Sequence, residues 1–148
     1  MKRLYYASLT YMIVGIASGL FYRELTKFNE FEGDTQLAVA HTHLLVLGMF
    51  FFLIMIALEK LFTLSDARTF RWFFWTYNAG VIVTVSMQIV HGSMTVLGHE
   101  SGPAIAGIAG MGHIFITIGL VLMFIALKGK LLTTTRDSVA TLPGTSPG

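Results

Sequence analysis

The sequence predicts an all-α fold: an integral membrane bundle of four helices that run up, down, up and down. Of its 148 residues, 54% are hydrophobic and only 12% are charged, whereas soluble domains carry about 25% charged residues. The hydrophobic residues form four blocks, each near the roughly 20 residues that a helix needs to cross a bilayer. The connections between the blocks are short, so successive helices are expected to be antiparallel neighbours.

The four predicted spans carry formal charges only near their ends. A helix buried in a soluble protein would show a polar stripe with a period of 3.6 residues, but these blocks are apolar all round. We expect one domain over residues 1–130, followed by a flexible tail over 131–148, which is rich in Thr, Ser, Gly and Pro. The predicted spans are residues 4–22, 37–58, 72–97 and 104–127.

The basic residues indicate an orientation. Arg23 and Lys27 fall on one side of the predicted bundle, and the other eight basic residues fall on the side of both termini. The positive-inside rule then places the N- and C-termini in the cytoplasm, as in a multi-pass protein of the inner (plasma) membrane. The eight are Lys2, Arg3, Lys60, Arg68, Arg71, Lys128, Lys130 and Arg136.

The composition excludes several classes of function. The chain has no Cys, which rules out disulfide scaffolds, zinc ribbons, Cys-ligated iron–sulfur clusters and Cys nucleophiles. A net charge of +2 is too small to indicate a nucleic-acid partner. Any metal or cofactor within the spans must therefore be held by imidazole.

Four histidines lie at similar depth in three of the predicted spans. His41 and His43 are on the second span, His91 is on the third and His113 is on the fourth. At 1.5 Å per residue, all four lie about 5 to 11 Å outward of the span centres. Ionisable side chains inside a membrane are costly and usually mark a functional site. We therefore take these four as candidate cofactor and metal ligands, and place His99 outside them, at the outer boundary.

The spacing of His41 and His43 predicts two different environments. Helical residues two apart point about 200° away from each other around the axis. The two imidazoles then serve two sites that flank the helix, or one binds a ligand while the other hydrogen-bonds a neighbour.

The third and fourth spans carry further features near their histidines. Thr84 and Gln88 share a stripe with His91 and are expected to orient its ring by hydrogen bonding. Small residues precede His113, and residues 15–19 form a GxxxG pattern on the first span. We expect both small-residue runs to be helix-packing surfaces.

Among ligands for such a layer, haem b fits the sequence best. Imidazole suits zinc, copper, nickel and haem iron, and no carboxylate lies among the histidines to favour a di-iron, calcium or magnesium site. Haem needs only one or two imidazoles in an apolar surround, and Arg23 with Lys27 would meet its propionates at the outer interface. Copper or zinc needs three or four converging imidazoles. Because His41 and His43 point in nearly opposite directions, the histidines could converge on one ion only across subunits.

The segment 40–50, AHTHLLVLGMF, resembles the metal-bearing helices of the catalytic subunit of haem–copper oxygen reductases. It also resembles the related haem- and copper-containing membrane proteins of nitrosative-stress resistance. In the reductases one helix carries a His-x-His whose imidazoles ligate two haems on opposite sides. The whole chain is similar to an uncharacterised family of small four-span bacterial membrane proteins.

The resemblance implies a module equivalent to one four-helix arc of the twelve-helix reductase, assembled as a homotrimer that rebuilds the ring. His41 and His43 match the haem-ligand pattern, His91 matches only by helix and depth, and His113 has no counterpart. The paired adjacent histidines of the copper site and the cross-linked His–Tyr pair are missing, so oxygen reduction and proton pumping do not carry over.

Three hypotheses of function follow. The leading one is a membrane haem-binding protein for electron transfer, with a redox partner that the sequence does not identify, or for binding of a small gas such as NO or O2. The alternative is a copper- or zinc-binding membrane protein or transporter that uses the same histidines. The third is a structural protein whose histidines are only hydrogen-bonded. No catalysed reaction can be read from these residues.

Overall fold

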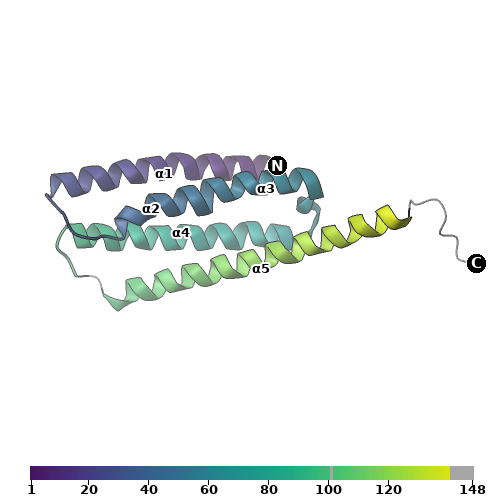
Figure 1. The fold of residues 1–148 in the computed structure, drawn as a ribbon. Helices are drawn as coiled ribbons and strands as arrows, with labels where there is room; N and C mark the ends of the chain where they lie inside the picture. Colours follow the sequence, from purple (N-terminus) through teal and green to yellow (C-terminus); the bar gives the residue numbers. More distant parts are fainter. Residues whose placement is uncertain (101, 141–148) are drawn as a thin grey trace, which may run out of the picture.

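The computed structural model describes residues 1–100 and 102–140, and in this part of the chain every regular element is helical. Four stretches are long and apolar enough to cross a membrane: Lys2–Phe28, Leu37–Phe62, Arg68–Val96 and Pro103–Leu132. The predicted fold of four antiparallel membrane-spanning helices is confirmed (Figure 1). In chain order the elements are α1 (Lys2–Phe28), α2 (Leu37–His43), the π-helix η1 (Leu44–Phe50), α3 (Phe51–Phe62), the 3-10 turn η2 (Leu64–Asp66), α4 (Arg68–Val96) and α5 (Pro103–Ala140).

The C-terminal boundary differs from the expected one. We expected a flexible tail from residue 131, but α5 continues to Ala140, and the remainder of that tail, 141–148, lies outside the described residues. The extension has a local cause, because the sequence contains neither Gly nor Pro between Gly129 and Pro143. These two residues are the strongest breakers of a helix.

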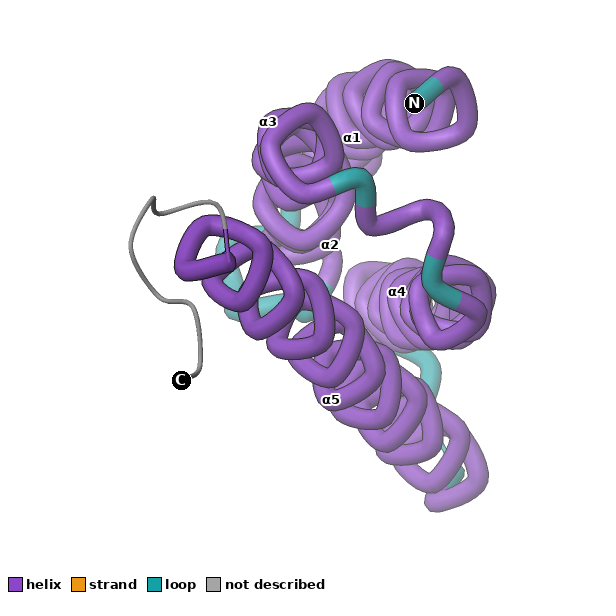
Figure 2. Tube along the Cα trace, turned by 90° about the vertical axis from the view of Figure 1, so that its right-hand side faces the viewer, coloured by secondary structure: helices purple, strands orange, loops and turns teal. Residues whose placement is uncertain are grey.

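The four spans form an open row. In the described part of the chain, α1 packs on the continuous helix of α2, η1 and α3, which packs on α4, and α4 packs on α5. Among the residues that the structure describes, α5 contacts α3 and η2 in addition to α4, and it makes no close backbone contact with α1, α2 or η1. Figures 1 and 2 show α5 crossing the other helices at an angle, so that it diverges from α2 toward the end of the bundle that carries the α1–α2 loop.

Glycines determine how closely α4 and α5 approach. A Cβ at Gly80 would lie 2.6 Å from the Ile116 amide nitrogen, and one at Gly112 would lie 2.9 Å from the Thr84 nitrogen. Real Cβ atoms do not come this close to backbone, so only glycine allows the crossing. The same glycines thereby determine which face of α5 is turned away from α4.

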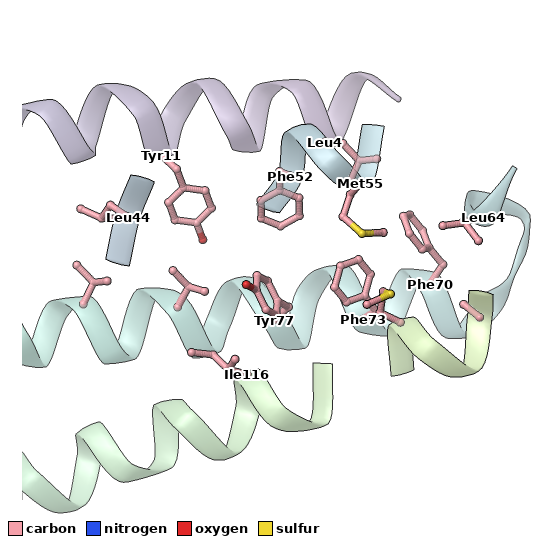
Figure 3. Close-up of a cluster of buried hydrophobic side chains, with 14 of the residues drawn as sticks. Leu4, Tyr11, Leu44, Phe52, Met55, Leu64, Phe70, Phe73, Tyr77 and Ile116 are labelled. Carbon is pink, nitrogen blue, oxygen red and sulfur yellow. The ribbon is translucent and has the colours of Figure 1, made fainter. Parts of the chain in front are cut away.

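An aromatic cluster fills the space between α1, α3 and α4 (Figure 3). Phe52, Phe73 and Tyr77 are almost fully buried. The rings of Phe51 and Tyr77 stack with centroids 4.4 Å apart. Offset-stacked aromatic pairs contribute about 0.5 to 1.5 kcal/mol beyond the area they bury. These aromatic residues lie nearer than the histidines to the end of the bundle where α1 begins, whereas the wider apolar core continues to Leu44 and Ala40 beside the histidines.

The π-helix η1 follows His43 directly and was not expected from the sequence. Side chains of both neighbouring helices bond to its carbonyls: the Ser8 hydroxyl donates to Met49 O at 2.9 Å, and the Tyr77 hydroxyl donates to Leu47 O at 3.0 Å. Tyr11 packs on Gly48, where an added Cβ would lie 2.6 Å from the tyrosine Cβ. Single π turns inside α-helices are frequent at functional sites.

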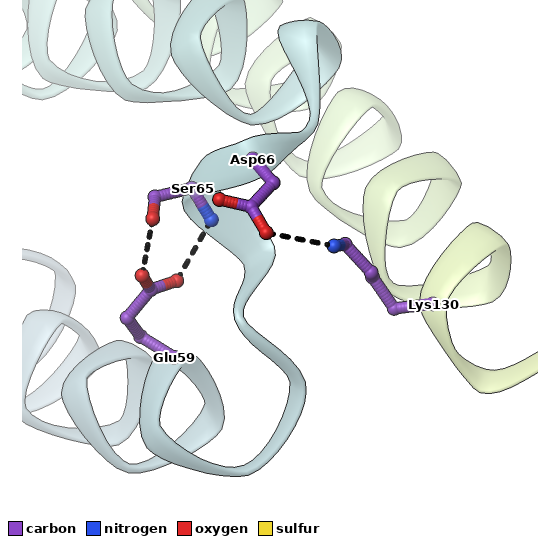
Figure 4. Close-up of polar contacts among 4 residues, drawn as sticks. All are labelled: Glu59, Ser65, Asp66 and Lys130. Carbon is purple, nitrogen blue, oxygen red and sulfur yellow. Dashed lines mark hydrogen bonds and ion pairs between the residues drawn. The ribbon is translucent and has the colours of Figure 1, made fainter. Parts of the chain in front are cut away.

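Two carboxylates stabilise the turn between α3 and α4 (Figure 4). Glu59 is buried and accepts hydrogen bonds from the Ser65 amide, at 2.8 Å, and from the Ser65 hydroxyl. Asp66 pairs with Lys130 of α5 at 3.3 Å. Both contacts lie at the end of the bundle where α1 begins, and they connect the turn η2 to the second and fourth spans.

Candidate functional site

We use the term histidine layer for His41, His43, His91 and His113. The structure distributes these residues over α2, α4 and α5. It does not bring them together at one point, and the described residues contain no group of three His, Cys, Asp or Glu that could hold a metal ion. A copper or zinc site built within one chain is therefore not formed by the described residues.

His41 lies against α1. A Cβ at Gly19 would meet the His41 Cβ and Cγ at 3.6 Å, which is ordinary van der Waals contact. The Nδ1 atom of His41 is buried and has no hydrogen-bond partner. Its Nε2 is 3.5 Å from the Thr42 hydroxyl, which is too long for a strong hydrogen bond. The ring is thus held by packing and keeps hydrogen-bonding capacity for a ligand.

His43 is oriented by its own helix. Its Nδ1 lies 2.9 Å from Val39 O. A carbonyl oxygen can only accept a hydrogen bond, so Nδ1 carries the proton. In the neutral ring the lone pair then resides on Nε2, which is the nitrogen free to bind a metal. Because α2 is a regular helix, His43 faces away from the side on which His41 meets α1.

His113 repeats this arrangement on α5. Its Nδ1 lies 3.0 Å from Ala109 O, so the proton resides on Nδ1 and Nε2 is again the free nitrogen. The side chain is exposed. Its neighbour Gly112 is the residue that packs on Thr84, so His113 projects to a side of α5 that α4 does not cover.

His91 is not oriented as expected. We predicted that Thr84 and Gln88 would bond to its ring, but all three side chains have a buried polar atom without a partner. Thr84 faces Gly112 of α5 instead, because α5 crosses α4 closely at this position and covers the part of the α4 surface that carries Thr84. His91 lines a pocket of about 480 Å³ that is also bordered by Tyr22 and Val39.

Within the described residues, five buried polar side-chain atoms toward this end of the bundle have no hydrogen-bond partner. Such atoms are rare in folded proteins, because each one left unpaired costs about 1 to 3 kcal/mol. Sequence reasoning identified four of the five residues and missed Ser18, which is buried one residue before Gly19 of the GxxxG pattern. The atoms are Ser18 Oγ, His41 Nδ1, Thr84 Oγ1, Gln88 Oε1 and His91 Nδ1.

Arg23, the expected propionate partner, lies near the C-terminal end of α1. It is one turn beyond Gly19 on the same face of α1, so it lies closer than His41 to the α1–α2 loop end of the bundle. The Arg23 side chain is 70% exposed, and its contact with Glu24 is long at 3.8 Å. An exposed pair of this kind contributes at most about 1 kcal/mol, so Arg23 is readily available to an anionic group.

The two small-residue runs behave differently. Gly15 and Gly19 of the GxxxG pattern pack against Leu45 and His41, so this run forms a packing surface between α1 and the second span, as predicted. On α5, Gly112 packs on α4, but a Cβ at Gly107 or Gly110 would meet nothing within 4 Å. The N-terminal part of α5 therefore presents a face of small residues that the described part of this chain leaves uncovered.

Comparison with known proteins identifies a family. A family model described as "Protein of unknown function (DUF2871)" matches residues 1–130. The match covers all four membrane-spanning helices and the whole histidine layer. No curated protein and no solved structure matches the chain.

Proposed function

We propose that this chain, which belongs to the DUF2871 family, is a membrane haem-binding protein that holds haem b through the histidine layer. The observation that carries the proposal is the hydrogen bond from His43 Nδ1 to Val39 O. Histidines that ligate metals usually donate the second ring N–H to a carbonyl or carboxylate, which fixes the tautomer and the ring plane. His43 has this arrangement inside an apolar helix.

The donor set fits haem better than a bare metal ion. Haem iron needs one or two axial imidazoles, and His43 and His113 each offer a free Nε2. A copper or zinc ion held without porphyrin needs more converging ligands, which the described part of one chain does not supply. Such a site requires histidines from several copies of the chain.

His41 and His91 also have ring nitrogens that are available to a ligand. Both have a buried Nδ1 that lacks a partner. His41 lies on the side of α2 that meets α1, and His91 lies on α4, which also packs on α2. Two imidazoles that point in opposite directions from one helix can serve two ligand sites, one on each side of the helix, as the local resemblance to the haem–copper reductases implies. Arg23 lies outward of His41 and supplies a cation for a propionate.

The open row of helices favours assembly with further copies. Within the described residues α5 does not cover α2, and the outer face of α5 carries the exposed His113 and uncovered glycines. A homotrimer that closes a twelve-helix ring would bury these surfaces around the cofactor. In this arrangement both termini lie in the cytoplasm and the histidine layer lies in the outer half of the inner membrane.

Haem held in this way supplies one-electron transfer to a redox partner or binding of a gas such as NO or O2. The residues of this chain hold the iron through imidazole, exclude water with apolar side chains and neutralise the propionates. Nothing in the arrangement specifies a catalysed reaction.

An absorption spectrum of the detergent-purified protein, reduced minus oxidised, tests the proposal. We expect a Soret band and stoichiometric iron, with loss of the band in His43→Ala and a weakened or shifted band in His41→Ala. His99→Ala is the matched control, because His99 is exposed in the loop after α4, and it should keep the wild-type spectrum. Copper or zinc without porphyrin would support the alternative function, and no stoichiometric ligand would support a structural role.

A rescue experiment separates ligation from folding. In His43→Gly, added imidazole should restore the spectrum, because it replaces the missing ligand without restoring the side chain's packing. Failure of rescue in a variant that retains its helical circular dichroism would contradict ligation by His43.

A further inference from the structure

A second site lies at the other end of the bundle. A pocket of about 510 Å³ is lined by three basic residues, Lys2, Arg3 and Arg71, together with Ser65 and Phe70. All three basic side chains are exposed. None of them pairs with a carboxylate of the described residues, so their charge is not neutralised within this part of the chain.

The carboxylates near this pocket are already engaged. Glu59 is bonded to the amide and hydroxyl of Ser65, and Asp66 is paired with Lys130 (Figure 4). Three cations without such partners, placed at the end of membrane-spanning helices, create an anion site at the membrane interface. Basic pockets of this kind bind acidic lipid head groups.

An apolar groove begins where the basic pocket ends. It has a volume of about 710 Å³, lies between α1 and α4, and shares Arg3 and Phe74 with the basic pocket. Viewed along the helices, α1 and α4 stand on the same side of α3 (Figure 2). The two hollows therefore form one continuous path from the basic end into the bilayer.

The length of the groove matches a lipid chain. On α1 its lining runs from Arg3 to Val14, which at 1.5 Å per residue is about 16 Å along the axis. One leaflet of the hydrocarbon core is about 15 Å thick, half of the full 30 Å. An acyl chain that starts at the interface therefore fits along the groove.

Two polar side chains that line the groove, Tyr11 and Asn78, are paired within the protein. The Tyr11 hydroxyl donates to Asn78 Oδ1 at 2.8 Å, and Asn78 Nδ2 donates to Phe74 O at 2.6 Å. The rest of the lining is mostly apolar, which suits hydrocarbon better than a polar ligand.

We infer that this pocket and groove form a binding site for an anionic phospholipid, with the phosphate on Lys2, Arg3 and Arg71 and an acyl chain between α1 and α4. The site is separate from the histidine layer and does not depend on the proposed haem. With the predicted orientation, it faces the cytoplasmic leaflet.

Quenching of tryptophan fluorescence by brominated lipids tests the inference. The chain has two tryptophans, of which Trp75 lines the groove, so Trp72→Phe leaves a single reporter. The protein is reconstituted in phosphatidylcholine vesicles with a minor fraction of phosphatidylglycerol, with bromine on the chains of one lipid or the other at equal bromine content. We expect stronger quenching by brominated phosphatidylglycerol, and equal quenching by the two lipids would overturn the inference.

Matched variants locate the phosphate. Arg71→Gln should lower the apparent affinity for phosphatidylglycerol about fivefold, the contribution of one basic residue at a membrane surface. Arg68→Gln changes the same charge one turn earlier on α4, outside the lining of the pocket, and should leave the affinity within twofold. Equal losses in both variants would mean diffuse attraction to the surface and would overturn the site.

A second pair of variants tests the position of the lipid acyl chain. Thr10→Phe narrows the groove at an exposed position of its lining, whereas Ile13→Phe alters an exposed position outside it. Thr10→Phe should reduce quenching of Trp75 and Ile13→Phe should not. Unchanged quenching in Thr10→Phe would overturn the placement of the acyl chain.

Discussion

The hydroxyl of Tyr77 on α4 donates a hydrogen bond to the carbonyl of Leu47, 3.0 Å away inside the π-helix of the second span. This contact joins a core aromatic residue to the segment that follows His43. It also gives a partner to a backbone carbonyl that lies where the regular α-helical pattern is interrupted. The Tyr77 side chain therefore links the histidine-bearing span to α4.

Tyr77→Phe removes this hydrogen bond and keeps the stacked ring. We expect a loss of about 1 kcal/mol in the free energy of unfolding, since hydrogen bonds between transmembrane helices contribute from about 0.6 to 1.7 kcal/mol. Reversible unfolding in mixed micelles measures the change. Tyr5→Phe is the control, because Tyr5 is exposed, and an equal loss in both variants would contradict a specific role for the Leu47 contact.

Gly48→Ala places a methyl group where the Tyr11 ring packs, 2.6 Å from the tyrosine Cβ. The atoms that must move are at the base of the side chain, so relief requires a shift of α1 or η1. We expect a destabilisation of about 1 to 3 kcal/mol, as for other overpacked cores, measured as a lower thermal midpoint in detergent.

Gly107→Ala is the matched control for Gly48→Ala. A Cβ at Gly107 meets nothing within 4 Å, and Ala is favoured over Gly in a helix by up to about 1 kcal/mol. This variant should keep or raise the thermal midpoint. A fall as large as that of Gly48→Ala would show that the outer face of α5 is already packed against something in the sample.

Glu59→Gln and Asp66→Asn should differ in their effects on stability. Glu59 is buried and accepts two hydrogen bonds from Ser65, and charge-assisted bonds contribute about 1.5 to 3 kcal/mol. Asp66 is exposed and pairs with Lys130, a class of ion pair that contributes at most about 1 kcal/mol and weakens with salt. Unfolding at low and high salt separates the two, and a larger effect of Asp66→Asn would contradict the structure of this turn.

The absence of cysteine makes the predicted orientation easy to test. Glu32→Cys in the α1–α2 loop should react with a membrane-impermeant maleimide added to intact cells. Lys60→Cys, near the end of α3, should react only after the membrane is opened. The cysteine-free parent chain is the control for background labelling, and the reverse pattern would place both termini outside.

Much of the fold could be predicted because it depends on composition along the chain. Four apolar blocks, short connections and charges at the block ends are sufficient for four antiparallel spans, since lipid accepts only segments whose backbone polar groups are satisfied internally. The opposed directions of His41 and His43 also followed from sequence, because the rotation per residue in a regular helix is constant.

The tertiary structure decided what depends on contacts between spans. The π-helix after His43 is contacted by Ser8, Tyr11 and Tyr77 from two other helices. No local sequence pattern predicts those contacts. Likewise, Gly80 and Gly112 bring α4 and α5 together at a crossing that turns His113 outward and leaves Thr84 facing α5 rather than orienting His91. The sequence by itself determined the number of spans and the depth expected of each histidine, because both depend only on local hydrophobicity and helical rise. Which imidazoles pack inside and which face away from the other helices were decided by packing, because this depends on which atoms of distant helices come into contact.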